Sequence, residues 1–259
     1  MKTRSELQRI LITGATGGIG QALARQYAGV GRTLVLHSRD EARLNSLARE
    51  CASLGAAVET LVFDLSGHGA TEAWQATLAA LPPLDLVLVN AGVTSHIGRQ
   101  AEGESWQAIA ETVDINLYSA MATVSAVLPA MRKRGRGQIA LISSLSAWYG
   151  LPLTPSYCAA KAGLKAYGES LRGWLACEGI SVNVVLPGFV ATGMSDRFPG
   201  PRPFMLTPVQ AARRIARGLQ RDQARISFPF PLNLSMWGLA VLPSWLSQRL
   251  LQWTGFGRR

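Results

Sequence analysis

Lysine is scarce in this chain and occurs only at Lys2, Lys133, Lys161 and Lys165. Basic residues nevertheless outnumber acidic residues by 26 to 16, so arginine carries most of the net charge of +10. A positive balance of this size suits a nucleic acid, an anionic membrane or a phosphorylated cofactor as partner. The arginines are scattered and no basic module interleaved with aromatic residues is present, which argues against nucleic-acid binding.

Cysteine is also sparse, and Cys51, Cys158 and Cys177 lack the spacing of a metal site. We therefore expect no bound metal and a reducing, cytoplasmic compartment. No signal-peptide hydrophobic segment stands before the first apolar stretch at Arg9, which points the same way. The chain also lacks long linkers, low-complexity tracts and repeats. We predict one α/β domain over residues 1–228, followed by a hydrophobic extension over residues 229–259.

A glycine-rich turn with the sequence TGATGGIG, residues 13–20, follows an apolar strand expected over residues 9–13. A helix extends from this turn to about Ala28. Strand, turn and helix in this order aim backbone N–H groups at a pyrophosphate, and glycine lets the phosphates approach closely. An ordinary strand–helix connection is the simpler alternative. The candidate phosphate contacts are Gly14, Thr16, Gly18, Ile19 and Gly20.

Further apolar strands, at residues 33–37, 58–63 and 84–89, alternate with helices. This alternation predicts a three-layer α/β fold of the Rossmann type with a doubly wound parallel sheet. Ligands of such sheets bind at the carboxyl ends of the strands. Asp64 and Leu65 after the third strand, and Asn90, Ala91 and Gly92 after the fourth, are therefore candidate cofactor contacts. Asn90 and Gly92 would also suit a plain turn.

The end of the second strand bears on the choice between NAD and NADP. An acidic residue there would bind the ribose hydroxyls of NAD, whereas arginine accommodates the 2′-phosphate of NADP. This chain has Ser38 and Arg39 at that point, and its first acidic residue is Asp40. We predict NADP(H) in preference to NAD(H), the alternative being that Arg39 simply faces solvent.

Tyr157 and Lys161 are four residues apart, and Ser144 precedes the tyrosine by thirteen. Positions i and i+4 of a helix share a face, so the two side chains are expected to project into the same space. An ammonium group beside a phenol lowers the pKa of the tyrosine. Such a tyrosine can exchange a proton with an alcohol or carbonyl oxygen near neutral pH.

These motifs together resemble the short-chain dehydrogenase/reductase family in its compact single-domain form. The resemblance extends from about Arg9 to Phe228. It rests on the glycine turn at 13–20, Asn-Ala-Gly at 90–92, Asn116, Ser144, Tyr157, Lys161 and Pro187-Gly188. It implies a seven-stranded parallel sheet, a nicotinamide cofactor, a carbonyl or alcohol substrate, and a homodimer or homotetramer assembled through long helices near 104–131 and 155–178.

The resemblance also implies residue roles. Ser144 and Tyr157 would hydrogen-bond the substrate oxygen, and Tyr157 would donate the proton. Lys161 would lower the pKa of Tyr157 and bind the nicotinamide ribose, while Asn116 would hold a water in the proton relay. Pro187, Gly188, Val190 and Thr192 would surround the nicotinamide, with Thr192 bonded to its carboxamide.

Two other functions stay open at this point. Residues 13–20 also satisfy the pattern of the longer epimerase-like relatives, although the short chain, the Asn-Ala-Gly motif and Pro187-Gly188 argue against that branch. A non-catalytic dinucleotide-binding sensor or scaffold is the other alternative. Loss of Tyr157 or Lys161 would have favoured it, and both are present.

The last part of the chain is unusual. Residues 193–206 contain Pro199, Pro201 and Pro203 and suggest an apolar lid over the substrate, with Met194, Phe198, Phe204 and Met205. The 23 residues from 226 to 248 have no formal charge, but Pro229, Pro231 and Pro243 make a full membrane span unlikely. The tail is expected either at a membrane interface, through Trp237, Trp245, Trp253, Arg249, Arg258 and Arg259, or packed on the core around a lipophilic substrate pocket or subunit interface.

Overall fold

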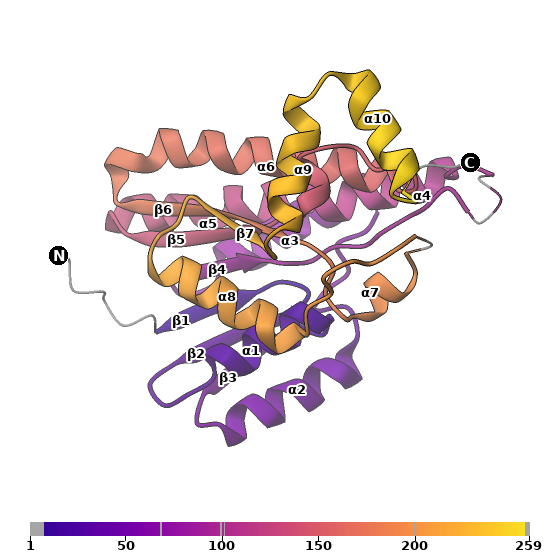
Figure 1. Cartoon of the computed structure of the whole chain (residues 1–259). Helices are drawn as coiled ribbons and strands as arrows, with labels where there is room; N and C mark the ends of the chain where they lie inside the picture. The colour runs from indigo at the N-terminus through magenta and orange to yellow at the C-terminus, as the bar shows by residue number, and fades with distance from the viewer. Residues whose placement is uncertain (1–7, 68, 99, 101, 199, 257–259) are drawn as a thin grey trace.

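The computed structural model describes residues 8–256 except 68, 99, 101 and 199. Its centre is a parallel sheet of seven strands in the order β3-β2-β1-β4-β5-β6-β7 (Figure 1). The predicted fold class is confirmed. The strands are β1 (Arg9–Ile12), β2 (Thr33–Ser38), β3 (Ala57–Val62), β4 (Leu86–Val89), β5 (Gly137–Ile142), β6 (Ile180–Pro187) and β7 (Arg225–Phe228).

Helices connect successive strands and cover both faces of the sheet. They are α1 (Gly18–Tyr27), α2 (Glu41–Ser53), α3 (Ala70–Ala79), α4 (Trp106–Val113), α5 (Ser119–Arg134), α6 (Pro155–Leu175), α7 (Gly193–Asp196), α8 (Pro208–Gln220), α9 (Leu232–Val241) and α10 (Ser244–Trp253). A π-helical turn, Asp114–Tyr118, joins α4 to α5, and single 3₁₀ turns occupy Leu145–Ala147 and Ala176–Glu178.

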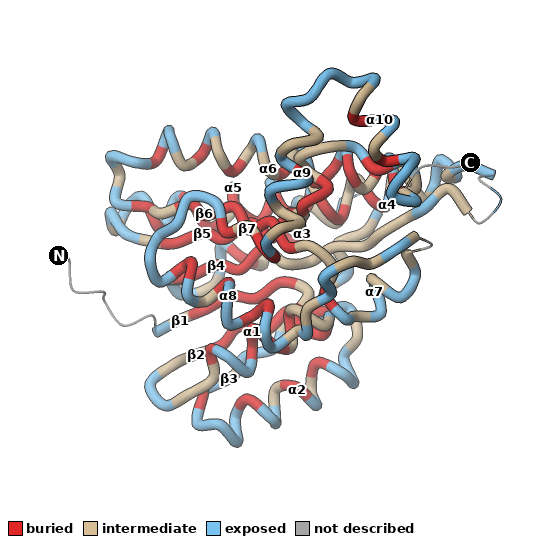
Figure 2. The backbone as a smooth tube through the Cα atoms, in the orientation of Figure 1, coloured by how far each residue is buried: buried red, intermediate tan, exposed pale blue. Residues whose placement is uncertain are grey.

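The sheet separates two apolar cores. One lies between the strands and α1, α2 and α8, and the other between the strands and α3, α5 and α6. The central strands are buried on both faces, which explains their continuous apolar sequences, such as LVLV in β4. Burial in Figure 2 follows the strands and the inward sides of the helices. The edge strand β3 is largely exposed and carries polar residues such as Glu59.

The chain reverses its direction of winding between β1 and β4, which are hydrogen-bonded neighbours in the centre of the sheet. Strands β2 and β3 lie on one side of this point, and β5, β6 and β7 lie on the other. Loops after β1 and β4 therefore separate above the strand ends and leave a crevice, which is the ligand site of doubly wound sheets.

The helix expected near 104–131 begins two residues later, at Trp106, because Ser105 caps α4 by accepting a hydrogen bond from the Ala108 amide. With the π turn and α5 it continues to Arg134, where Gly135 adopts φ +62 and ends it. By length and composition this helix would be able to cross a membrane. Half of its apolar window is buried inside the molecule.

The sheet ends at Phe228, where we placed the boundary of the α/β domain. Beyond it, α9 and α10 form a hairpin whose two helices are separated at Pro243. Met236 and Leu251 from this hairpin enter a third apolar cluster with Leu145, Cys158, Val184 and Leu186. The tail thus packs against the sheet end next to α6.

Candidate functional site

A cavity of about 1160 Å³ opens in the crevice at the carboxyl ends of the strands. Its wall includes residues from the loops after β1, β2, β3, β4, β5 and β6, from α6 and from the tail. All candidate catalytic and cofactor-binding residues from the sequence line it except Gly20 and Asn116. The topology thus brings together residues from Gly14 to Thr192, which are far apart in the chain.

Close backbone packing explains the glycines of the first turn. Gly14 has φ +62, and a Cβ added to it would lie 2.7 Å from the Ala91 Cα. A Cβ on Gly20 would lie 2.3 Å from the Gly14 carbonyl oxygen, so Gly20 acts beneath the turn and not in the cavity wall. Helix α1 begins at Gly18 without a side-chain cap, leaving its amino end open toward the cavity. The turn has the shape that a pyrophosphate requires.

Asn90 fixes this turn to the neighbouring strand. Its Nδ2 donates to the carbonyl oxygens of Thr13 and Gly14 at 3.1 and 3.0 Å. The amides of Asn90 and Ala91 both donate to the Thr13 Oγ1, at 2.9 and 3.0 Å. The Asn90 side chain is therefore engaged in holding the turn, although the residue also lines the cavity.

His37 supports the turn from below, and the sequence analysis missed it. Its Nδ1 accepts the Gly14 amide at 3.2 Å and its Nε2 lies 3.0 Å from the Phe63 carbonyl oxygen. Burial lowers the pKa of His37 to about 4, so the ring is neutral at physiological pH. A neutral ring with its proton on Nε2 satisfies both bonds. The only signal in the sequence was a histidine in an otherwise apolar strand.

The region after β2 contains two arginines. The Arg39 side chain is 60% exposed and comes within 4.0 Å of the Glu111 carboxylate. Arg43, which the sequence analysis also missed, lines the same part of the cavity and donates to the Thr16 carbonyl oxygen at 2.8 Å. The hydroxyls of Thr16 and Ser38 are 2.6 Å apart. Arg43 lies in the first turn of α2, whereas Arg39 precedes that helix, so helical spacing from Arg39 does not indicate Arg43.

Asp64 and Leu65 line the cavity beyond β3. Burial acts to raise the pKa of Asp64, but hydrogen bonds from the amide and hydroxyl of Ser66 and the positive charge of Arg39 outweigh it. The net effect is a lowered pKa. The carboxylate is consequently ionised and anchors the loop that follows β3.

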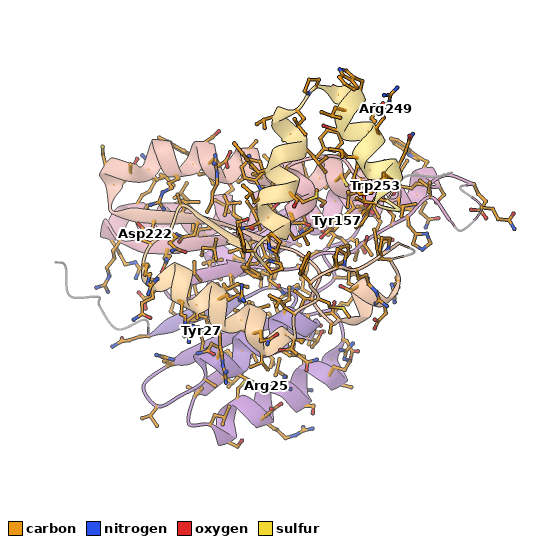
Figure 3. The ribbon with its side chains drawn as sticks, in the orientation of Figure 1. Arg25, Tyr27, Tyr157, Asp222, Arg249 and Trp253 are labelled. Carbon is orange, nitrogen blue, oxygen red and sulfur yellow. The ribbon has the colours of Figure 1, made fainter. Side chains whose placement is uncertain are left out.

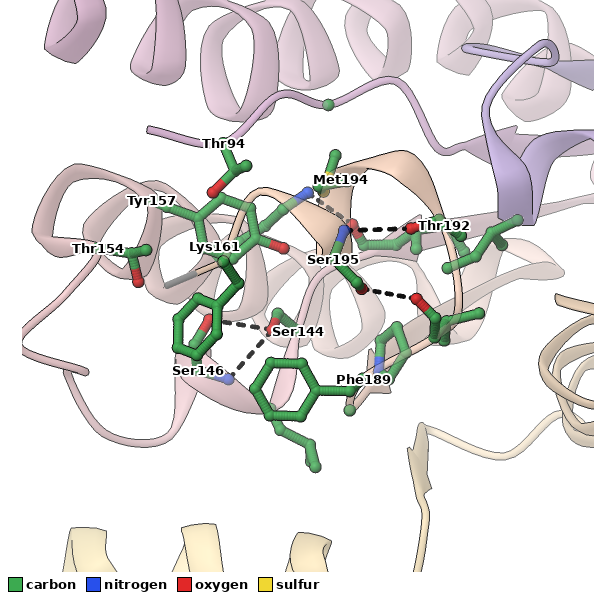
Figure 4. A pocket seen from close by; sticks show the side chains of 18 of the residues that line it. Thr94, Ser144, Ser146, Thr154, Tyr157, Lys161, Phe189, Thr192, Met194 and Ser195 are labelled. Carbon is green, nitrogen blue, oxygen red and sulfur yellow. Dashed lines mark hydrogen bonds between the residues drawn. The ribbon is translucent and has the colours of Figure 1, made fainter. Parts of the chain in front are cut away.

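Tyr157 and Lys161 lie on one face of α6 at the floor of the cavity (Figure 4). The Lys161 Nζ is 5.7 Å from the centre of the Tyr157 ring and donates to the Ile142 carbonyl oxygen at 2.9 Å. Ser144 follows β5 and hydrogen-bonds the Tyr157 phenol. The amide and hydroxyl of Ser146 donate to the Ser144 Oγ at 3.1 and 2.9 Å, which fixes its orientation.

The predicted direction of the tyrosine shift is wrong for this structure. Desolvation by the surrounding protein raises the pKa of Tyr157 to about 12, and the hydrogen bond from Ser144 only partly opposes it. Burial lowers the pKa of Lys161 to about 7. The lysine is therefore only partly protonated at neutral pH, while the phenol keeps its proton.

Asn116 lies behind this group, in the π-helical turn between α4 and α5. Its Nδ2 donates to the carbonyl oxygens of Val93 and Thr112, both at 2.8 Å. Its Oδ1 is buried and has no hydrogen-bond partner among the described residues. Asn116 is fully buried in this π turn, with its amide directed into the protein and not toward the helix surface.

A carboxylate that the sequence analysis did not consider holds the start of α6. Glu104 accepts from the amide and hydroxyl of Ser156 at 3.0 and 2.7 Å, and from the Ser95 hydroxyl. Thr112 donates to the Ser95 Oγ at 3.2 Å. Because Thr154 gives α6 no side-chain cap, Glu104 provides the negative group at this helix end, beside Tyr157.

The loop after β6 crosses the cavity opposite α6. Pro187, Gly188, Val190 and Thr192 all line it. The Thr192 Oγ1 accepts the Ser195 amide at 3.4 Å and so caps α7, and a Cβ on Gly18 would lie 2.3 Å from the Thr192 methyl carbon. Thr192 therefore contacts the glycine turn directly, and its bond to a carboxamide stays a prediction.

The expected lid is partly seen in residues 193–206. Met194, Phe198, Pro201, Pro203 and Phe204 line the cavity. Met205 is exposed and is not part of the cavity wall, and Pro199 lies outside the described residues. The lid is tied at its base by mutual hydrogen bonds of Phe189, Ala191 and Leu206.

The tail forms the remaining wall, as one of the two sequence alternatives expected. Its apolar contributors are Leu232, Met236, Leu239, Leu242, Leu250, Leu251 and Phe256. The Phe256 ring centre lies 6.4 Å from that of Phe189 and 6.3 Å from that of Phe198. The lid and the tail thus meet in one aromatic cluster.

Comparisons with known proteins show the family of this chain. A family model described as short chain dehydrogenase matches residues 8–200. The chain is 35% identical over 235 residues to an uncharacterized oxidoreductase of Myxococcus xanthus, covering 90% of this chain and 92% of that protein. It is 32% identical over 253 residues to short-chain dehydrogenase/reductase 3 of Homo sapiens, covering 95% of this chain and 81% of that protein.

A solved structure is also similar. The short-chain dehydrogenase from Sphingobium yanoikuyae in complex with NADPH superimposes with a TM-score of 0.81 and 26% sequence identity. The match covers 95% of this chain and 96% of that one.

Proposed function

Because the chain belongs to the short-chain dehydrogenase/reductase family and is an oxidoreductase, we propose that it interconverts a carbonyl and a secondary alcohol on a lipophilic substrate with NADP(H). One observation carries this proposal. Ser144, Tyr157 and Lys161 line the same cavity as an apolar wall from the tail, and the glycine turn opens into its other end.

The residues present fit a nicotinamide dinucleotide. The glycine turn leaves no room for side chains, and the buried Asn116 Oδ1 needs a polar partner on the cavity side. Gly14, Thr16, Gly18 and Ile19 would hold the pyrophosphate, and residues 64–65, 90–92 and 187–192 the remaining parts. Two arginines, Arg39 and Arg43, at the Ser38 end of the cavity support a preference for the 2′-phosphate of NADP.

The chemistry divides between cofactor and protein. A bound nicotinamide supplies or accepts the hydride. The Ser144 hydroxyl and the Tyr157 phenol hydrogen-bond the substrate oxygen, and Tyr157 donates its proton as negative charge develops there. Lys161 holds positive charge beside the resulting phenolate. The free amide oxygen of Asn116 and the Lys161 Nζ both lie beside Gly92. Asn116 would hold a water there that relays protons to Lys161.

The tail supports a lipophilic substrate. Leucine, methionine and phenylalanine side chains of α9, α10 and residue 256 face the cavity, where a polar substrate would lose hydration without compensation. We also propose that residues 229–259 belong functionally to the catalytic unit, that the protein is a cytoplasmic homodimer or homotetramer, and that its tail makes peripheral contact with a membrane.

The test is NADPH oxidation by the purified protein against ketones, aldehydes, 3-oxoacyl thioesters and steroids, with NADH in parallel. We expect turnover on lipophilic carbonyls with NADPH preferred. Tyr157→Phe should abolish this turnover and preserve NADPH binding, whereas Tyr118→Phe, at an exposed position, should leave both unchanged. Retained activity in Tyr157→Phe would overturn the mechanism, and NADPH binding without any turnover would favour a sensor.

A further inference from the structure

The α9–α10 hairpin exposes an apolar surface on the side that faces away from the core. Trp237 is 46% exposed, Val241 and Trp245 are each 61% exposed, and Trp253 is 86% exposed. Helix α9 has no charged residue, its polar side chains are Asn233 and Ser235, and Met236 is its only buried residue. A helix that is apolar around most of its circumference is expected in a protein core or a membrane. Half of the residues of α9 are exposed in this structure and lie in neither environment.

The α9–α10 hairpin carries one charged residue, which is basic. No residue of α9 is charged, and the charged residue of α10 is Arg249. The Arg249 guanidinium lies 5.7 Å from the Trp245 ring centre. Figure 3 shows Arg249 beside the upper part of α10 and Trp253 at its lower end, with Tyr157 below the hairpin. Tryptophan with adjacent arginine and no carboxylate is the composition found at the headgroup level of anionic membranes.

The substrate cavity reaches this surface. Leu239, Leu242 and Leu250 line the same cavity as Tyr157, and Leu242 is itself 37% exposed at the turn between the helices. The Ser247 hydroxyl, fully buried, donates to the Leu239 carbonyl oxygen at 2.8 Å and holds the two helices together. An apolar path therefore leads from the exposed turn between the two helices toward the tyrosine.

We propose that the outer face of the α9–α10 hairpin docks on an anionic lipid bilayer, so that a lipophilic substrate passes from the bilayer into the cavity along Leu242. This inference deepens the membrane contact proposed above by naming the face and the lipid, and it rests on the proposed carbonyl–alcohol activity only for the identity of the passenger. A second copy of the chain is the other candidate occupant. It would cover Leu242 and close the apolar path, whereas a bilayer both covers the tryptophans and supplies the substrate.

The experiment measures co-sedimentation of the full-length protein with mixed phosphatidylcholine–phosphatidylglycerol vesicles and with phosphatidylcholine vesicles alone. The variant carries Trp237→Gln and Trp245→Gln, two exposed residues that do not line the cavity. Trp174→Gln is the matched control. Trp174 is 57% exposed and lies seventeen residues beyond Tyr157 on α6, about 25 Å along the helix axis.

We expect the wild type and the control to sediment with the mixed vesicles, and the double variant to bind about tenfold more weakly. Binding to phosphatidylcholine alone should be weaker than to the mixture, because Arg249 lacks an anionic partner there. Wild-type protein that stays in the supernatant, or a double variant that sediments as well as the wild type, would overturn the proposal. The proposal would also be overturned if the wild type and the control were oligomers and the double variant a monomer, because the face would then bind a second copy of the chain.

Turnover of a water-soluble ketone without vesicles keeps the two proposals separate. The double variant should retain it, since neither tryptophan touches the cavity. Vesicle binding with no turnover of any carbonyl would overturn the proposed carbonyl–alcohol interconversion and leave the docking intact. Full turnover without vesicle binding would overturn the docking and leave the proposed carbonyl–alcohol interconversion intact.

Discussion

The amide oxygen of Asn116 and the ammonium nitrogen of Lys161 face the same small space beside Gly92. A Cβ placed on Gly92 would lie 2.7 Å from the Asn116 Oδ1 and 3.4 Å from the Lys161 Nζ. Both groups are held from behind, Asn116 through the carbonyl oxygens of Val93 and Thr112, and Lys161 through that of Ile142. Gly92 is thus required where it stands because its missing side chain leaves room for these two atoms to approach.

The first prediction concerns this space. Gly92→Ala should push the Asn116 amide out of position and lower kcat by about a hundredfold, the lower end of the range for loss of proton-transfer catalysis. Dissociation of NADPH should change much less. Steady-state kinetics and NADPH titration measure the two effects. Gly173→Ala on α6 is the control, since a Cβ there meets no atom within 4 Å. Normal kcat in Gly92→Ala would contradict the arrangement.

The second prediction concerns the stability of the buried lysine. Unfolded lysine has a pKa of 10.5, and burial lowers that of Lys161 to about 7. Between these values the unfolded state binds one more proton, so this group makes the folded protein more stable as pH rises from 7 toward 10.5. Lys161→Met removes the free-energy cost of burying the lysine amine, but it leaves the Ile142 carbonyl oxygen without its hydrogen-bond donor. The variant should therefore be more stable than the wild type near pH 7, by about 3 kcal/mol.

Urea unfolding across this pH range measures the difference, which should shrink as pH approaches 10.5. Lys133→Met, at an exposed position at the end of α5, should show no such trend. A Lys161→Met variant less stable than the wild type at every pH would show that the lysine stabilises the fold. The expected gain is an example of stability given up for function.

Much of this site was predictable from sequence because its backbone conformation and close packing require glycine at particular positions, and these glycines can be recognised in the sequence. Gly14 has a positive φ, and Gly20 packs against the Gly14 carbonyl oxygen, so these positions must be glycine. The parallel sheet followed from apolar strands alternating with helices, and its boundaries shifted by only a few residues. The side-chain environments were not predictable in this way. The pKa of Tyr157 depends on how completely protein surrounds the phenol, which local spacing does not report.

Other features depend on contacts between distant segments. Glu104 binds Ser156, fifty-two residues later, and His37 accepts a bond from Gly14, twenty-three residues earlier. Neither residue belongs to a recognisable local motif. The tail was ambiguous for the same reason, because an uncharged segment suits both a membrane and a core. The structure shows its inner face in the cavity wall, while its outer face is exposed.

The third prediction concerns the choice of cofactor. Arg39→Asp should reverse the preference for NADPH over NADH, because a carboxylate at the end of β2 repels a 2′-phosphate and accepts bonds from ribose hydroxyls. Arg43 also lines this part of the cavity, so the single substitution should reduce NADPH affinity without abolishing it. The ratio of kcat/KM for the two cofactors is the measurement. Arg49→Asp, exposed on α2 and outside the cavity wall, should leave the ratio unchanged. An unaltered ratio in Arg39→Asp would mean that Arg39 only faces solvent.

The fourth prediction concerns Glu104, which we regard as a positioning residue. Its carboxylate accepts both hydrogen bonds of Ser156, the residue next to Tyr157, and so fixes the first turn of α6. Glu104→Ala should lower the free energy of unfolding by about 1–3 kcal/mol, since the Ser156 amide and the hydroxyls of Ser156 and Ser95 all lose this acceptor. It should also lower kcat about tenfold with little change in the KM for NADPH, because a displaced phenol donates its proton less well.

Glu104→Gln separates position from charge. The glutamine amide oxygen still accepts from Ser156, so this variant should recover most of kcat if the carboxylate acts by holding the helix. Glu72→Ala, an exposed residue of α3, is the control for removal of a surface carboxylate. If Glu104→Ala loses stability but keeps wild-type kcat, Glu104 only stabilises the fold. If Glu104→Gln is as slow as Glu104→Ala, catalysis requires the negative charge at the amino end of α6 and not only the hydrogen bonds to Ser156. The pKa of Tyr157 would then depend on that charge.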